Sequence, residues 1–309
     1  MNALAPVGLD ALARPSAVPE RKDPDVLRWR FPEAVAPWTL VGASRAALST
    51  GFCIPEMDWL LDAGVLVHDQ RPSHIFVSHT HSDHVHQLPR IKSRRKPPLI
   101  TLPHLSVPLL EDWFRTSQAL TFGAQIDDEE LLERSYDLLG VAPGDSLRIA
   151  RGRVISQVDV VACDHAMDCV GYLFSEIKLR LKDEFAGLPG AQLGALRRQG
   201  VELSEEVPRP QLAYLTDTTA RVFDRHPEVL QAPVIVTECT FIDDDHREAA
   251  ERTRHTLWSD LLPVIEAHPQ ACFVLIHFSQ RYRDEELVRF FAERAPDNVI
   301  PWLDGALAA

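Results

Sequence analysis

The segment H-T-H-S-D-H, which begins at His79, constrains this chain more than any other feature. The run before it, 73–78, is apolar and β-branched, which predicts a buried strand that ends at His79. Because side chains alternate along an extended chain, His79 and His81 face the same side. Asp83 and His84 then follow on the first turn of a short helix and point in a different direction. The segment therefore predicts ligands for one metal ion and makes a second ion possible.

Neutral imidazole nitrogens and carboxylate oxygens suit zinc, with manganese or iron as the neighbouring choices. The alternative is a histidine-rich surface loop or a few hydrogen-bonded core histidines. Single histidines are common, whereas three histidines and one carboxylate within six residues are rare. This density favours the metal site.

Three further polar residues each follow an apolar, strand-like run. They are His165, Asp217 and His277. Any one of them alone is better explained as a loop residue or a hydrogen-bonded strand end. Their recurrence at the same position relative to a strand predicts that they complete a binuclear site.

The chain resembles the metallo-β-lactamase superfamily and, within it, the tRNase Z (ribonuclease Z) branch, particularly the short form found in plants. The likeness covers most of the chain. Besides the histidine segment, it rests on residues 171–172, 215–219, 237–241 and 276–282, and on 182–188 and 196–202, which contain no metal ligand. The string His277-Phe278-Ser279-Gln280-Arg281-Tyr282 is the most specific to the branch. The resemblance implies an α/β fold, an αββα sandwich of two mixed β-sheets packed face to face with helices outside.

The resemblance also implies a role for each candidate residue. One zinc ion is held by His79, His81, His165 and Asp217, and the other by Asp83, His84, Asp217 and His277. Asp217 thus bridges the two ions. The catalytic residues are Asp83, His255, which helps the leaving 3′-oxygen, and Glu238, which orients His255. Without the resemblance, His255 beside Arg254 is better explained as an exposed helix residue.

The implied enzyme is a zinc-dependent phosphodiesterase that removes 3′ trailers from precursor tRNA by attack of a metal-bound hydroxide, working as a homodimer. One alternative is a hydrolase of the same fold that acts on a small phosphodiester or another ester. Another is a non-enzymatic metal-binding scaffold, which the presence of every candidate ligand and of His255 disfavours.

Three departures from the family pattern bear on the substrate. His86 and Gln87 stand where the family usually has two glycines, and Thr216 stands where it has glycine before the bridging aspartate. Since glycine permits close backbone approach, bulkier residues are expected to narrow the floor of the site. The interval between Gly171 and Asp217 is short and not strongly basic, so we expect the long basic arm with which bacterial members clasp tRNA to be missing.

The net charge gives no support to RNA binding. The chain has 32 basic and 45 acidic residues, a formal charge of -13, whereas proteins that grip nucleic acid non-specifically are normally basic. Two local clusters are either solvated faces or contacts for a phosphate backbone. They comprise Arg90, Lys92, Arg94, Arg95 and Lys96, and Lys178, Arg180 and Lys182.

The remaining composition is that of an ordinary soluble enzyme. With 309 residues and 45% apolar content, we expect one domain over residues 26–309 after a disordered tail at 1–25. We expect neither a signal peptide nor a membrane span. The five cysteines form no CxxC pair, which favours the reducing cytoplasm.

The apolar pattern predicts where the elements lie. Strands are expected at about 38–41, 51–55, 73–78, 98–102, 153–163, 170–174, 211–216, 234–239 and 271–277, and helices near 103–116, 127–138, 191–200, 245–267 and 281–295.

Overall fold

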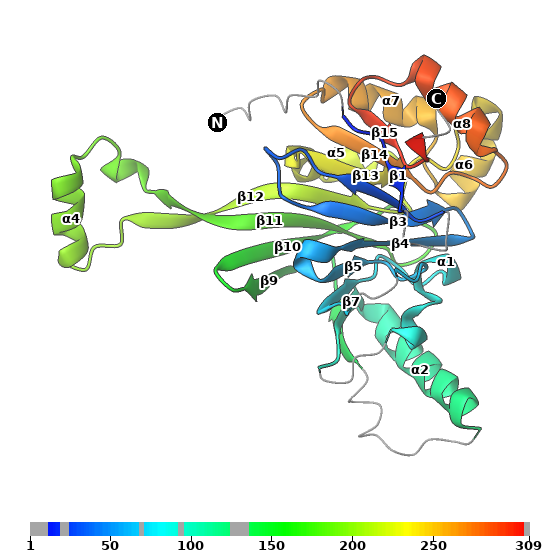
Figure 1. The fold of residues 1–309 in the computed structure, drawn as a ribbon, viewed down its shortest axis with the longest axis horizontal. Helices are drawn as coiled ribbons and strands as arrows, with labels where there is room; N and C mark the ends of the chain where they lie inside the picture. Colours follow the sequence, from blue (N-terminus) through cyan, green and yellow to red (C-terminus); the bar gives the residue numbers. More distant parts are fainter. Residues whose placement is uncertain (1–11, 19–24, 68–70, 92–95, 124–135, 306–309) are drawn as a thin grey trace.

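The computed structural model describes residues 12–18, 25–67, 71–91, 96–123 and 136–305, and its strands form two sheets (Figure 1). The first sheet has eight strands in chain order: β1 (Ser16–Ala17), β2 (Leu27–Arg30), β3 (Thr39–Arg45), β4 (Ser49–Ile54), β5 (Trp59–Leu61), β6 (His74–Phe76), β7 (Leu99–Pro103) and β8 (Asp137–Val141). The second has seven, in the spatial order β15 to β9: β9 (Ser146–Arg151), β10 (Val154–Ala162), β11 (Val170–Leu181), β12 (Ser204–Leu215), β13 (Val234–Glu238), β14 (Cys272–Ile276) and β15 (Val299–Pro301).

The helices lie between and after these strands. They are α1 (Ser82–Val85), α2 (Val107–Phe122), α4 (Gly190–Arg198), α5 (Val222–Arg225), α6 (Arg247–Thr253), α7 (Trp258–Ala267) and α8 (Asp284–Arg294). Short 3₁₀ turns are η1 (Pro55–Met57), η2 (Leu88–Arg90), η3 (His104–Ser106), η4 (Asp183–Phe185), η5 (Pro227–Gln231) and η6 (Asp244–His246). In the part of the chain described, no helix combines the length and apolarity that crossing a membrane requires.

Both sheets are mixed, and in the same way. The first is antiparallel from β1 to β5 and parallel from β5 to β8. The second is antiparallel from β9 to β12 and parallel from β12 to β15. Parallel neighbours end at the same edge of a sheet. The residues that follow β12, β13 and β14 therefore meet at one edge.

Three apolar cores separate four layers, which confirms the predicted αββα sandwich. The core between the sheets contains Trp59, Phe76 and Phe174, whose rings lie 5.0 to 5.5 Å apart. Such aromatic pairs each contribute about 0.5–1.5 kcal/mol beyond the burial of their area. A second core packs α7 and α8 on one sheet, and a third packs α2 on the other.

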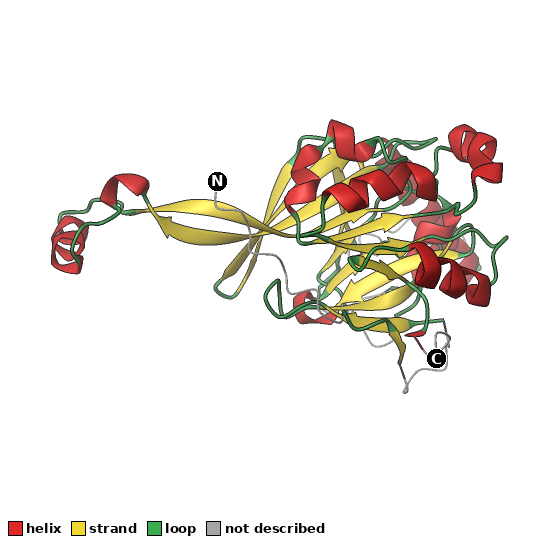
Figure 2. Cartoon of the chain, turned by 90° about the horizontal axis from the view of Figure 1, so that it is seen from above, coloured by secondary structure: helices red, strands yellow, loops and turns green. Residues whose placement is uncertain are grey.

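A two-stranded arm leaves the second sheet and carries α4 at its far end (Figures 1 and 2). The first six residues of β11 are buried and its last four are exposed, while β12 ends in five buried residues. The prediction that an arm is missing is therefore wrong, whereas the prediction that this interval is not strongly basic is confirmed by six basic and six acidic residues between 176 and 209. The outer part of β11 alternates charged and apolar residues, but no core covers either face of the arm, so the continuous apolar runs used to predict strands stop where the arm begins.

Two predicted helices differ from the structure. The stretch 245–267 is divided into α6 and α7, because Arg254 adopts a left-handed φ of 54° that ends α6. The helix predicted at 127–138 lies mostly outside the described residues, and Asp137 already belongs to β8. Of the predicted tail 1–25, the structure describes 12–18 and residue 25, and β1 pairs with β2 there.

Candidate metal centre

The histidine segment turns sharply at the end of β6 and packs α1 against the turn after β5. The backbone N–H of Ala63 donates to the carbonyl of His84 at 2.6 Å. A Cβ placed on Gly64 would lie 1.7 Å from the carbonyl oxygen of Asp83. Only glycine allows this approach, which sets the position of Asp83 and His84.

One group of ligand atoms forms a compact cluster. His79 Nε2 lies 3.0 Å from His81 Nδ1, and His165 Nε2 lies 3.3 Å from the same atom. Asp217 Oδ2 is 3.5 Å from His79 Nε2 and 3.9 Å from His165 Nε2. Ligand atoms held about 2.0–2.2 Å from one tetrahedral zinc ion lie about 3.3–3.6 Å apart. These four side chains fit around one ion.

A second cluster uses the other oxygen of the same aspartate. Asp217 Oδ1 lies 3.3 Å from His84 Nε2 and 3.4 Å from His277 Nε2. Asp83 Oδ2 completes the cluster at 3.6 Å from His84 Nε2 and 3.4 Å from His277 Nε2. Asp217 therefore presents one carboxylate oxygen to each group, which is the geometry of a bridging ligand.

The chemistry of the clustered groups fits divalent ions. His84 Nε2 and Asp217 Oδ1 are buried and have no hydrogen-bond partner among the described residues. Burial, and then the neighbouring His84, hold the pKa of His79 well below its usual value, and burial also lowers the pKa of His81 and His165. These rings are neutral near pH 7, as metal ligation requires.

The carboxylates are held in the ionised form. Burial alone would raise the pKa of Asp217, but His277, His84 and His79 together lower it well below the usual range. Burial likewise opposes ionisation of Asp83, yet the hydrogen bond to His277 brings its pKa to about 2. Both carboxylates are thus charged at neutral pH.

Asp62 supports the second cluster from behind, and the sequence analysis missed it. Its carboxylate lies 2.9 Å from His84 Nδ1 and accepts hydrogen bonds from the Ser78 backbone, the Ser78 hydroxyl and the Tyr214 hydroxyl. Burial opposes protonation of His84, but Asp217 and Asp62 raise its pKa well above the usual value. Asp62 therefore fixes the ring so that Nε2 faces the cluster. Asp62 follows β5 as the other candidates follow their strands, and this signal could have identified it.

His277 is held by backbone geometry as well as by hydrogen bonds. It has a φ of 62°, a left-handed conformation that non-glycine residues adopt at an energetic cost. Its Nδ1 lies 3.0 Å from the Thr240 hydroxyl, which donates to Glu238 Oε2 at 2.5 Å. Thr240 thereby links this ligand to Glu238.

His255 lies beside both clusters, in the link between α6 and α7 rather than on a helix. Its ring centroid is 5.1 Å from that of His165 and 5.3 Å from that of His277. His255 Nδ1 lies 2.8 Å from Glu238 Oε1. The fully buried Glu238 also accepts the backbone N–H of Thr218 and Thr256. The predicted pairing of His255 with Glu238 is thus present in the structure.

This pairing determines the charge of His255. Burial alone would lower its pKa, but the charge of Glu238 and the hydrogen bond to it raise the pKa to about 9. The ring is therefore protonated at neutral pH and can donate a proton from Nε2.

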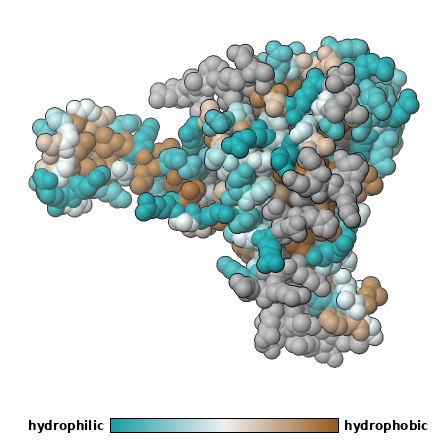
Figure 3. All heavy atoms as spheres, viewed as in Figure 1, coloured by the Kyte–Doolittle hydropathy of each residue, from teal (hydrophilic) through white to brown (hydrophobic). Residues whose placement is uncertain are grey.

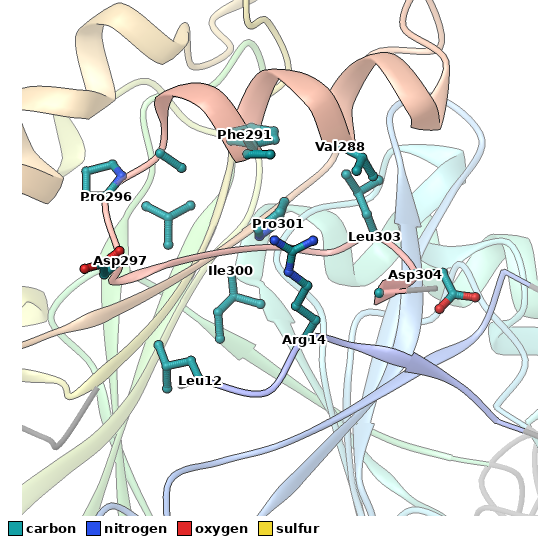
Figure 4. Close-up of a pocket in the computed structure, with 14 residues that line it drawn as sticks. Leu12, Arg14, Val288, Phe291, Pro296, Asp297, Ile300, Pro301, Leu303 and Asp304 are labelled. Atoms are coloured by element: carbon teal, nitrogen blue, oxygen red, sulfur yellow. The ribbon is translucent and has the colours of Figure 1, made fainter. Parts of the chain in front are cut away.

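Arg254 ties this link to the first cluster. Its guanidinium donates to the carbonyl of His165 at 3.0 Å, and its own carbonyl lies 3.4 Å from His165 Nδ1. A cleft of about 880 Å³ opens here, lined in part by Asp164, Arg225, Arg254 and His255. A second hollow of about 450 Å³ lies between α8 and β15 (Figure 4), and no candidate ligand lines it.

The structure thus brings together all the candidate ligands, His255 and Glu238. His81 is the exposed member of its cluster and faces solvent. Of the three residues that stand where the family usually has glycine, Thr216 is fully buried, whereas His86 is exposed and bonds to the carbonyl of Ser82. The side chain of Gln87 accepts a hydrogen bond from Arg90.

Comparison with known proteins agrees with this geometry. A family model described as the metallo-beta-lactamase superfamily matches residues 57–168. The chain is 28% identical to tRNase Z TRZ1 of Arabidopsis thaliana over 88% of this chain and 94% of that protein. It is 29% identical to ribonuclease Z of Thermobifida fusca over 75% of each chain.

Two solved structures share the fold. The short form of human tRNase Z matches with a TM-score of 0.51 at 16% identity, over 86% of this chain and 95% of that chain. The metallo-beta-lactamase fold protein YhfI of Bacillus subtilis matches with a TM-score of 0.54 at 13% identity, over 84% and 92%.

The chain has the metallo-β-lactamase fold, its residues 57–168 match the model of that superfamily, and its paired ligand clusters suit a metal-dependent hydrolase. Within that superfamily its sequence is similar to the tRNase Z enzymes, with plant forms at 26% and 28% identity.

Proposed function

We propose that this protein is a two-zinc endoribonuclease that removes 3′ trailers from precursor tRNA. The observation that supports it most is the division of the Asp217 carboxylate between two ligand clusters, with a protonated histidine beside both. The relatives named tRNase Z and ribonuclease Z supply the substrate class.

Each cluster would hold one ion. The ligands of the first ion would be His79, His81, His165 and Asp217, and those of the second would be Asp83, His84, Asp217 and His277. When bound, two such ions lower the pKa of a shared water and neutralise charge on a phosphodiester during in-line displacement. Zinc suits this mixture of imidazole and carboxylate ligands, and manganese or iron are the neighbouring choices.

The protein side chains perform the proton transfer. His255 donates the proton from Nε2 to the leaving 3′-oxygen, while Glu238 holds the ring through Nδ1 and keeps it protonated. Asp83 would supply a charged oxygen ligand to the second ion, next to His277 Nε2 at 3.4 Å. A positioned general acid of this kind contributes about 10²–10⁴-fold to the rate.

The arm supplies a surface for the body of the tRNA. Between residues 176 and 209 it carries six basic and six acidic residues, so its net charge is zero. Several of these charges pair within the arm, as Arg180 does with Glu205. Arg197 and Arg198 lie exposed in the last turn of α4, and Leu179 and Leu181 are also exposed. Figure 3 shows hydrophilic and hydrophobic residues together on the arm. We assign tRNA contact to this outer end of the arm.

Three further properties belong to the proposal. A homodimer fits the resemblance and the exposed apolar residues of α2, such as Leu109 and Leu120, and light scattering would measure its mass. A reducing cytoplasm suits the five free cysteines. A single domain over residues 26–309 suits the three shared cores, and limited proteolysis would test it.

The experiment that tests the function is cleavage of a 3′-extended precursor tRNA by zinc- or manganese-loaded protein, with bis-p-nitrophenyl phosphate in parallel. A His84→Ala variant should lose both activities. The matched control, His86→Ala, removes an exposed histidine two residues away and should retain them. Cleavage after the discriminator nucleotide is expected, whereas diester hydrolysis without RNA cleavage would replace the proposal by a small-substrate hydrolase.

A further inference from the structure

Two cysteines face each other at the base of the loop that carries His165. The register of β10 and β11 pairs Ala162 with Val170, so the next pair along the ladder is Cys163 and Cys169. The backbone N–H of Cys163 donates to the carbonyl of Cys169 at 3.1 Å. Burial, and then a hydrogen bond between the two side chains, raises the pKa of the Cys169 thiol.

Both thiols are connected to the metal centre. Cys163 and Cys169 close a short loop that contains His165, a ligand of the first cluster. The Cys169 thiol donates to the carbonyl of Asp217, the bridging residue, at 3.4 Å. A bond between the two sulfurs therefore acts on the positions of two ligands.

The geometry permits a bond between the two sulfurs. Opposite residues of a hydrogen-bonded antiparallel pair have Cα atoms about 5.5 Å apart, and disulfides span about 5.5–6 Å between Cα atoms. The remaining described cysteines, Cys53, Cys239 and Cys272, are buried, and no cysteine lies opposite Cys53 or Cys272 in the ladders. Cys163 is partly exposed, so an oxidant reaches it first.

We propose that Cys163 and Cys169 form a reversible disulfide that lowers the metal affinity of the first cluster. Hydrogen peroxide is the oxidant. The Cys163 sulfur takes an oxygen from peroxide and becomes a sulfenic acid, and one water is released. The Cys169 sulfur then attacks it, the S–O bond breaks, and the displaced hydroxide takes the thiol proton as a second water. Two thiols are oxidised by two electrons and one peroxide is reduced.

The disulfide changes the support of both ligands. The Cβ atoms must approach from about 4.5–5.5 Å to about 3.5–4.5 Å, which shifts the base of the His165 loop. The Cys169 S–H no longer exists, so the Asp217 carbonyl loses its donor. Loss of a group that orients a ligand typically costs about 10–100-fold in metal affinity. We expect a loss of that size, reversed by dithiothreitol.

Mass spectrometry detects the bond directly. Trypsin releases residues 154–178 as one peptide that contains both cysteines and no third one. After peroxide treatment this peptide should be lighter by two hydrogen atoms and should regain them in dithiothreitol. Oxidation of Met167 in the same peptide adds an oxygen instead, and dithiothreitol does not reverse it.

Competition with a chromogenic chelator measures the zinc affinity and thus the effect of the disulfide on metal binding. Wild-type protein should bind zinc about 10–100-fold more weakly after peroxide and recover in dithiothreitol. Cys163→Ser should bind zinc like reduced wild type, and its zinc affinity should not change with peroxide. Cys163→Ala takes its place if the serine variant does not fold.

A lighter peptide with unchanged zinc affinity would overturn the proposal. So would an equal, dithiothreitol-reversible loss of affinity in Cys163→Ser, or peroxide oxidation that stops at a sulfinic acid on Cys163. Neither measurement uses RNA, so an error in the assigned substrate would leave these results unaffected.

Discussion

Replacing His255 by glutamine tests the electrostatic pairing on which the proposed proton donor depends. The side chain of His255 is 16% exposed, and Glu238 is fully buried. Burial disfavours the charged ring, but Glu238 raises the pKa of His255 from 6.5 to about 9. The difference between these values corresponds to about 3 kcal/mol, since a tenfold change in the protonation constant is about 1.4 kcal/mol.

The sign of the pH dependence follows from the raised pKa. The folded protein holds this proton more tightly than the unfolded chain. The stabilisation is therefore complete below about pH 6.5 and disappears as the pH rises through about 9. His255→Gln removes it at all pH values. The loss of unfolding free energy caused by the substitution should be about 3 kcal/mol larger at about pH 6 than at about pH 9.5.

The assay is urea unfolding of metal-free wild type and variant at both pH values. His86→Gln, at an exposed histidine, controls for loss of an imidazole. With metal restored, His255→Gln should keep its ions and lose about 10²–10⁴-fold in kcat. A stability difference that is the same at both pH values would refute the pairing, and unchanged kcat would refute the proton-donor role.

Three further predictions concern other parts of the molecule. Asp62→Ala should weaken metal binding by about 10–100-fold, measured by equilibrium dialysis, because His84 loses the partner that orients its ring; unchanged affinity would exclude this role. Gly64→Ala should displace the Asp83 carbonyl and lower metal content, measured by plasma mass spectrometry, whereas Gly190→Ala, at a glycine with no neighbour within 4 Å, should leave it unchanged; equal effects would contradict the steric argument. Arg197→Ala combined with Arg198→Ala should lower kcat/KM for precursor tRNA and leave small-diester hydrolysis unchanged. The slope of log kcat/KM against log salt concentration should become shallower by about one unit for each phosphate that is no longer neutralised. Replacing Arg153 and Arg289 by alanine is the matched control, and an equal loss there would contradict tRNA binding by the arm.

The residues brought together at the site could be predicted because they obey one local rule. His165, Asp217 and His277 each follow a strand whose apolar run is visible in the sequence, and parallel strands end at a common edge. Asp62 obeys the same rule after β5, but the apolar run before it is only three residues long and no histidine lies within five residues of it. Its role appears only when Ser78, Tyr214 and His84 converge on it in space.

The arm and the position of His255 could not be predicted from the same signals. The outer halves of β11 and β12 cover no core, so they lack the continuous apolar run of the buried strands, although residues 176–181 of β11 alternate charged and apolar residues. The break after α6 is made by Arg254 in a left-handed conformation that sequences usually assign to glycine. With neither glycine nor proline at the break, the pattern 245–267 predicts one continuous helix.

A shared two-ion centre is tested most directly by the zinc content of the purified protein after equilibration with excess zinc and removal of free metal. Wild type should hold about two ions per chain, and Asp217→Ala, which removes one oxygen from each cluster, should hold fewer than one. The same zinc content in wild type and Asp217→Ala would contradict a centre bridged by Asp217.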